Sequence, residues 1–87
     1  MNIGDVVKSN KGRDNGTIYV VYSLRDDYVF CVNGKNRTMI KPKKKKIRHV
    51  NYLGQNIDEL KVKFTEHKKV LDSEIRKAID NLNIVEE

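Results

Sequence analysis

The sequence predicts a mainly β protein with a C-terminal helix. We expect about five short antiparallel strands forming a small barrel in residues 1–53, followed by one long amphipathic α-helix in residues 54–87. Two observations support this division. Through the first fifty residues, short runs of β-branched and aromatic residues alternate with turn residues and leave no room for a helix. Beyond Gly54, apolar residues recur in steps of three and four.

The first three strands are predicted from local composition. Residues 3–8 have Val6 and Val7 at their centre, and residues 17–23 are almost all β-branched or aromatic, which predicts the central and best-buried strand. Between them, residues 10–16 consist of turn formers, including two glycines. The third strand is expected at residues 28–32.

The last two strands are predicted from turn signals. Asn33-Gly34 favours a two-residue hairpin, because a type I′ turn needs positive φ at both positions. Residues 35–40 are then expected to return antiparallel to the third strand, with Pro42 as their limit, since proline cannot donate to a ladder. Residues 47–50 have the length for a short closing strand.

The helix is expected to begin at an Asn56 N-cap with Glu59 as its capping-box partner. No glycine or proline interrupts residues 57–82, so an unbroken helix there would be about 39 Å long, longer than a small barrel is wide. Its apolar stripe has two interpretations. It packs on the barrel, or part of it pairs with a second copy through residues spaced by seven, namely Ile57, Phe64, Leu71 and Ala78.

Charge is unevenly distributed along the chain. The net charge is +6, yet residues 1–53 carry 12 Lys and Arg against 4 Asp, whereas residues 54–87 carry 6 against 8 acidic residues. Clustered cations gain free energy by releasing counterions from phosphates. The front half of the chain is therefore suited to a polyanion.

Other chemistry finds little support in the sequence. Cys31 is the only cysteine, and Cys31, His49 and His67 match no metal-ligand or catalytic spacing, so we expect no enzyme, metal or cofactor. Cys31 in mid-strand is expected to be an inert core residue. The longest apolar run, residues 18–22, is too short for a bilayer, and a cytoplasmic protein is expected.

The basic turn at residues 10–16 is one candidate contact with phosphate. Gly12 and Gly16 permit positive φ and a close approach of backbone N–H groups, while Lys11 and Arg13 lie at the tip. The alternative is that the glycines only close the turn and that Asp14 pairs with Arg13.

The second candidate is the lysine-rich run of residues 41–46, followed by Arg48, whose mutual repulsion a polyanion would relieve. A solvated loop, a nuclear import signal and a membrane surface are the alternatives, with membrane ranked lowest. Tyr28 and Tyr52 are the aromatic candidates for stacking on a base.

The strand, glycine-punctuated basic turn and strand of residues 4–21 resemble the KOW motif. With Asn33-Gly34 and the later Lys-Pro-Lys run, residues 3–50 are similar to bacterial KOW-domain proteins that are grouped with a large-subunit ribosomal protein superfamily. This resemblance implies an SH3-like barrel that binds RNA. Residues beyond 56 lie outside the motif.

Together these observations predict an RNA-binding, ribosome-associated accessory protein of translation. The expected contacts to nucleic acid are the basic residues and turn glycines Lys11, Gly12, Arg13, Gly16, Arg37, Lys41, Lys43, Lys44, Lys45, Lys46 and Arg48. Expected partners are RNA, most naturally ribosomal RNA, then ribosomal proteins and a second copy through the helix, with no membrane. The alternative is a protein-interaction module that uses the barrel and the long helix.

Overall fold

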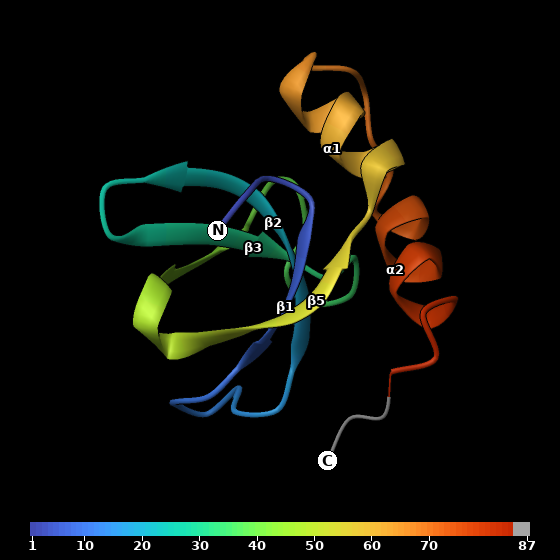
Figure 1. Ribbon diagram of the computed structural model, residues 1–87. Coiled ribbons are helices and arrows are strands. Elements are labelled where there is room, and N and C mark those ends of the chain that lie inside the picture. Colours follow the sequence, from blue (N-terminus) through green and yellow to red (C-terminus); the bar gives the residue numbers. More distant parts are fainter. Residues whose placement is uncertain (85–87) are drawn as a thin grey trace.

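The computed structural model describes residues 1–84 of the chain and contains five strands, one 3-10 turn and two helices (Figure 1). In chain order the elements are β1 (Asp5–Ser9), β2 (Ile18–Arg25), β3 (Tyr28–Val32), β4 (Lys43–Lys46), the 3-10 turn η1 (Ile47–His49), β5 (Val50–Asn56), α1 (Asp58–Thr65) and α2 (Asp72–Asp80).

The five strands form one antiparallel sheet in the order β4-β3-β2-β1-β5. The prediction of a mainly β fold with five antiparallel strands is therefore confirmed. The sheet curls on itself, with a register shift between Val21 and Ser23 on β2 and another between Asp5 and Val7 on β1. Such irregularities increase local twist and help a small sheet to close up.

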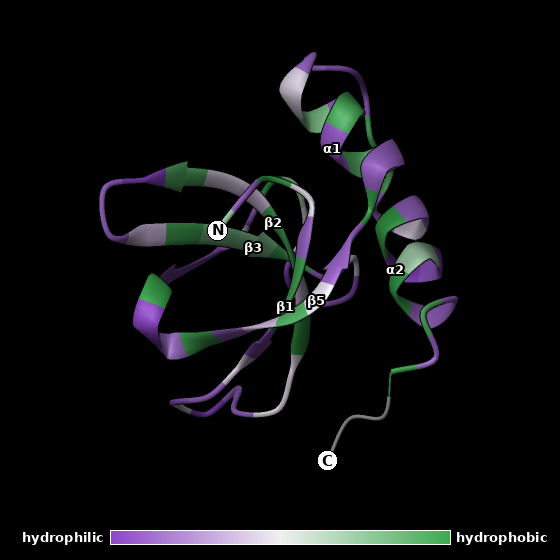
Figure 2. Cartoon of the chain, viewed as in Figure 1, coloured by the Kyte–Doolittle hydropathy of each residue, from purple (hydrophilic) through white to green (hydrophobic). Residues whose placement is uncertain are grey.

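Strand alternation divides the apolar residues between two cores. The inside of the curled sheet is filled by Val7, Tyr19, Val21, Val29, Cys31 and Val50, with Ile47 packed against them. Residues one position away point to the opposite face, where Val20 and Val32 meet the helices. In Figure 2 the hydrophobic colour accordingly follows the middle of the sheet, and the loops at its ends are hydrophilic.

The predicted Asn33-Gly34 hairpin is wrong. Gly34 does have positive φ (+75°), but residues 35–40 form a loop, and the strand that pairs with β3 is β4, with Tyr28 opposite Lys46 and Cys31 opposite Lys43. The Asn33 side-chain oxygen accepts hydrogen bonds from the N–H groups of Lys35 and Arg37 at 2.9 and 3.0 Å. Together with the bonds from the Asn33 and Gly34 N–H groups to the Arg37 carbonyl at 2.9 and 3.1 Å, they close a local turn that no returning strand follows directly.

The predicted closing strand is displaced. Residues 47–49 form η1, and the strand that pairs with β1 is β5, which runs from Val50 to Asn56, past the expected boundary at residue 53. The Ile47 N–H donates to the Asp27 carbonyl at 2.8 Å, which ties η1 to the turn between β2 and β3. This bond continues the β3–β4 register by one residue, so residue 47 lies beside Asp27 and does not pair with β1.

The single long helix is also wrong, because α1 and α2 are separate helices. The chain reverses between them, and His67 there has positive φ (+55°). The break lets both helices place apolar residues on the outer face of the sheet, where Leu60, Phe64, Val70 and Ile75 pack with Val20 and Val32. A straight helix of that length could not cover so small a sheet with its whole stripe. The Lys63 ammonium also binds the Glu74 carboxylate at 2.6 Å, joining the two helices.

The expected helix cap and helix pairing change accordingly. Asn56 ends β5 and donates to the Asp5 carboxylate at 2.9 Å, so the N-cap of α1 is Ile57, with no side-chain cap bond. Both helices pack on the sheet, through Leu60 and Phe64 of α1 and Ile75 of α2. In the residues spaced by seven, Phe64 is buried edge-on against Tyr22 (ring centroids 5.1 Å apart) while Leu71 is half exposed. They therefore do not form one continuous seam.

Candidate nucleic-acid interface

The turn between β1 and β2 is tightly closed by its own backbone. Gly12 and Gly16 both have φ of +93°, as the sequence required. The Gly16 N–H donates to the Ser9 carbonyl at 2.8 Å, and the Thr17 N–H donates to the Asp14 carbonyl at 2.9 Å. The turn therefore has a defined shape and extends its exposed Lys11 and Arg13 side chains into solvent.

Asp14 is the centre of this turn. Its carboxylate accepts hydrogen bonds from the Tyr19 hydroxyl at 2.6 Å, the Lys45 ammonium at 2.9 Å and the Ser9 hydroxyl at 2.9 Å. Burial disfavours the charged form, but hydrogen bonds from Tyr19, Lys45 and Ser9 outweigh it and lower the pKa of Asp14 to about 2. The expected alternative, pairing of Asp14 with Arg13, is therefore wrong.

Lys45 holds the turn against β4. Its side chain is only 7% exposed, and its ammonium donates to the Lys11 carbonyl at 2.9 Å as well as to Asp14. On the other side of the turn, Asn10 donates through its amide to the Arg48 carbonyl at 3.2 Å and through its backbone N–H to the His49 carbonyl at 3.0 Å. The turn, β4 and η1 thus lie together, and we call them the basic surface, with exposed or half-buried cations Lys11, Arg13, Lys44, Lys46 and Arg48.

The pKa of His49 is lowered by its position on the basic surface. Loss of hydration and the positive charges of Lys11, Arg48, Lys45 and Lys46 lower its pKa below the ordinary value. A cationic field from residues distant in sequence therefore converges at η1. Such a field attracts an anionic ligand.

The lysines of β4 divide between two faces. Lys44 and Lys46 lie on the same face as Tyr28 and Phe30, whereas Lys43 and Lys45 point to the opposite face, with Cys31 and Val29 across the ladder. The Lys44 ammonium lies 4.3 Å from the centre of the Tyr28 ring, a cation–π contact. Lys45 is buried against the turn, whereas Lys44 is exposed and Lys46 is half-buried, so the solvent-facing cations Lys44 and Lys46 lie on the Tyr28 face of β4.

Arg37 and Lys41 lie in the loop between β3 and β4. Arg37 is half-buried and close enough to Tyr19 for its charge to act on that hydroxyl, so it borders the Asp14 cluster. Burial and the neighbouring Asp14 nevertheless raise the pKa of Tyr19 far above its usual range. Lys41 is exposed, and among the hydrogen bonds and ion pairs of residues 1–84 its side chain contacts nothing on the basic surface.

The remaining reactive side chains are scattered. Cys31 is fully buried, and burial raises the pKa of its thiol to about 12, so it stays protonated. His49 lies in η1 and His67 in the turn between the helices. The described residues contain no group of three His, Cys, Asp or Glu side chains arranged to hold a metal ion.

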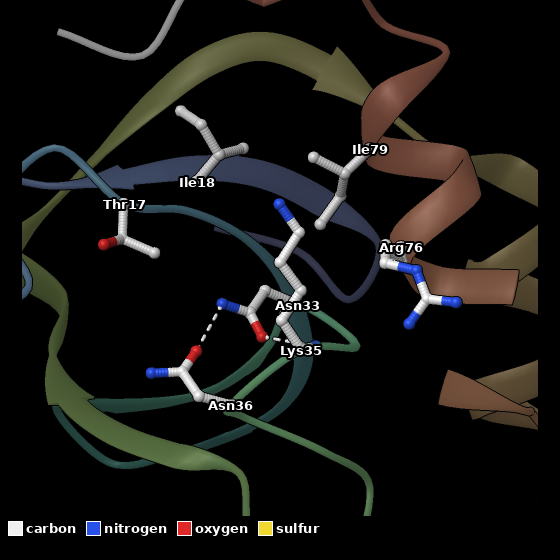
Figure 3. Close-up of a pocket in the computed structure, with 7 residues that line it drawn as sticks. All are labelled: Thr17, Ile18, Asn33, Lys35, Asn36, Arg76 and Ile79. Carbon is white, nitrogen blue, oxygen red and sulfur yellow. Dashed lines mark hydrogen bonds between the residues drawn. The ribbon is translucent and has the colours of Figure 1, made fainter. Parts of the chain in front are cut away.

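A small hollow of about 180 Å³ lies where the β3–β4 loop meets β2 and α2 (Figure 3). The Asn33 amide donates to the Asn36 oxygen at 3.0 Å, and the Asn33 oxygen is engaged by loop N–H groups. Figure 3 shows the Arg76 guanidinium directed away from Lys35. The Asn33 side chain is therefore bound within the β3–β4 loop, and the hollow is a structural junction between that loop and α2.

A larger hollow of about 450 Å³ adjoins the basic surface. It is lined by Asp27, Tyr28, Lys46, Ile47 and Arg48. The sequence had marked the tyrosine and the two cations, but Asp27 and Ile47 were missed. The local sequence does not predict that Asp27 and Ile47 line the same hollow. They come together through the hydrogen bond from the Ile47 N–H to the Asp27 carbonyl.

The helices leave the basic surface open. In Figure 1 both helices lie on one side of the sheet, and β4 with η1 lies on the other. Neither helix within residues 1–84 combines the length and the hydrophobicity that crossing a membrane requires.

Comparison with protein-family models and with curated proteins finds no match to this sequence.

Proposed function

We propose that this protein binds RNA through the sugar–phosphate backbone, using the basic surface, and that it serves as a ribosome-associated accessory protein without catalytic activity. The observation that carries the proposal is the attachment of the basic turn to β4 by Lys45. That contact holds the turn that carries Lys11 and Arg13 beside β4, and the neighbouring residues 44–48 carry the other cations.

The chemistry of this surface suits phosphate. Arg13 and Arg48 are exposed and offer guanidinium forks, and Lys11, Lys44 and Lys46 offer point charges. Among the described residues, none of these five side chains is in a salt bridge with a carboxylate. A polyanion can therefore bind these cations without breaking a salt bridge within the protein.

Lys45 has a different role from its neighbours in this proposal. Its ammonium is buried and bound to Asp14 and to the Lys11 carbonyl, so it positions the turn and does not contact phosphate. Gly12 and Gly16 shape the same turn through their positive φ. Arg37 borders the Asp14 cluster, Lys43 lies on β4, and Lys41 lies in the β3–β4 loop outside the basic surface.

The strand order supports an SH3-like barrel of the KOW type as the scaffold. A meander of β1 to β4, followed by a 3-10 turn and a fifth strand returning to β1, fits the resemblance carried by residues 3–50. The alternative, a protein-interaction module that uses the barrel and the long helix, has less support, because the chain has two shorter helices whose apolar faces are already packed on the sheet.

The proposal is tested by the salt dependence of RNA binding. We would measure fluorescence anisotropy of a labelled single-stranded RNA with the wild type and with a triple variant, K44Q/K46Q/R48Q. Each lost phosphate contact lowers the slope of log affinity against log salt by roughly 0.7. The triple variant is therefore expected to have a slope shallower by about 2, with weaker binding to every RNA sequence.

A matched control removes three charges elsewhere. K61Q/K69Q/K77Q changes three exposed lysines on the helical side by the same total charge. It is expected to keep nearly the wild-type slope. Equal losses in both triple variants would show that net charge alone drives binding, and would overturn the proposed surface.

A further inference from the structure

The larger hollow beside the basic surface is built from two segments that fix each other. Tyr28 and Lys46 are paired neighbours across β3 and β4, which places both side chains on the same face of the sheet. The Ile47 N–H donates to the Asp27 carbonyl at 2.8 Å, so η1 is held against the β2–β3 turn. The walls therefore belong to ordered strands and turns, and the volume of about 450 Å³ is in the range of small-molecule sites.

The lining combines three kinds of chemistry. Tyr28 and Ile47 give an aromatic and an apolar wall, Lys46 and Arg48 give two cations, and Asp27 gives an exposed carboxylate. Within residues 1–84, none of these three charged side chains is in a salt bridge. The Lys44 ammonium lies 4.3 Å from the centre of the Tyr28 ring, but Lys44 does not line the hollow.

We propose that this hollow holds one unpaired nucleobase of the bound RNA. The base lies against Tyr28 and Ile47, the adjoining phosphates bind Lys46 and Arg48, and the Asp27 carboxylate accepts a hydrogen bond from an exocyclic amino group. This inference rests on the proposed function and adds the ligand class: RNA with a single-stranded or extruded nucleotide that carries an amino group, such as cytosine.

Two features of the ligand follow. A nucleotide in a regular duplex keeps its base stacked and paired, so a continuous helix cannot fill the hollow. Uracil has no exocyclic amino group, and its O4 would face the Asp27 carboxylate as a second acceptor. Uridine is therefore disfavoured relative to cytidine.

The test compares three RNA octamers of equal charge: cytidine, uridine and abasic ribose phosphate. Base stacking of 1–3 kcal/mol corresponds to the cytidine octamer binding about 5- to 150-fold tighter than the abasic octamer. Hydrogen bonding to Asp27 is expected to favour cytidine over uridine by about tenfold. Equal affinity for all three octamers would overturn the base pocket and leave backbone binding standing, and failure to bind any of them would overturn both proposals.

Variants of Tyr28 and Asp27 test which residues cause the preference for cytidine. Y28L is expected to lose the difference between cytidine and abasic octamers while keeping the salt slope, and Y28F, which retains the ring, is expected to keep both. Y52L removes an exposed ring on β5 and is the matched control. D27N is expected to abolish the preference for cytidine over uridine. A Y28L protein that is folded by circular dichroism and still prefers cytidine would exclude Tyr28 from the site.

Discussion

The β1–β2 turn and the β3–β4 loop both contain glycine, but different forces hold them in place. The turn between β1 and β2 is fixed by charge, because Asp14 and Lys45 form a shielded ion pair with Tyr19 and Ser9. The loop between β3 and β4 is fixed by close packing, because Gly34 lies against the backbone of α2. The stability of the β1–β2 turn therefore depends on pH and on charge, whereas that of the β3–β4 loop depends on side-chain volume.

The two loops also differ in their roles: one contributes to the proposed RNA-binding surface, and the other joins the sheet to a helix. The charge-fixed turn carries part of the basic surface on which the proposed function rests. The packed loop instead joins the sheet to α2, where the Met39 N–H donates to the Asp72 carboxylate at 3.1 Å and the Arg76 guanidinium donates to the Gly34 carbonyl at 3.4 Å.

The largest effect is expected from G34A. An added Cβ would lie 2.2 Å from the Asp72 carbonyl oxygen and 2.8 Å from the Arg76 nitrogen, at a residue with φ of +75°. Backbone strain and overpacking together are expected to cost about 3 kcal/mol of unfolding free energy, measured by urea denaturation. G54A is the control: its φ is +83°, but its Cβ meets nothing within 4 Å. A loss of about 1 kcal/mol is expected there, and similar losses in both variants would contradict the packing argument.

The next effect is expected from K45M. Removing this ammonium leaves the Asp14 carboxylate shielded without its cation and releases the Lys11 carbonyl. The expected loss is about 2 kcal/mol of unfolding free energy. K44M, one residue away on the exposed face, is expected to change stability by less than about 0.5 kcal/mol and to weaken RNA binding instead. The reverse pattern would mean that the turn is not held by Lys45.

Acid is expected to loosen the turn. The pKa of Asp14 is lowered from 3.8 to about 2, so the folded state binds its proton less readily than the unfolded state does. This stabilisation is complete above pH 3.8 and is lost as pH falls from 3.8 to 2. Allowing for solvent screening, it amounts to about 1–2 kcal/mol. The free-energy gap between the wild type and D14N should shrink over that interval, and a constant gap would contradict the assigned pKa.

The smallest effect is expected at His49. Lys11 is one of the cations that lower the pKa of its imidazole, so K11Q is expected to raise that pKa, as measured by NMR titration. Because the two residues are far apart in sequence, the shift reports their proximity in solution. An unchanged His49 pKa would place the turn farther from η1.

The sequence predicts elements well where neighbouring residues decide the conformation. The first three strands, the positive φ of Gly12 and Gly16, and the division of Val29 from Tyr28 between two faces all follow from local composition and alternation. The five-stranded antiparallel sheet follows from the same signals.

The errors arise where distant residues decide. Asn33-Gly34 has the composition of a hairpin, but its positive φ serves the approach to α2. The helix break at His67 has no glycine or proline to mark it, and its cause is the outer face of the sheet, which both helices must cover. Within the lysine run, alternation alone indicates that Lys45 differs from Lys44. That Lys45 faces the protein depends on Asp14, thirty-one residues earlier.

The composition of β4 has a consequence for solubility. β4 is an edge strand of the sheet and consists of four lysines. Backbone groups on its outer edge could pair with another strand, and the positive charge of the lysine side chains opposes such pairing. Like charges on a second copy keep the two edges from joining. Replacing Lys43, Lys44 and Lys46 with threonine, with the buried Lys45 kept, should therefore promote aggregation through edge-to-edge strand addition. The cations proposed to attract RNA thus also repel a second copy of the protein.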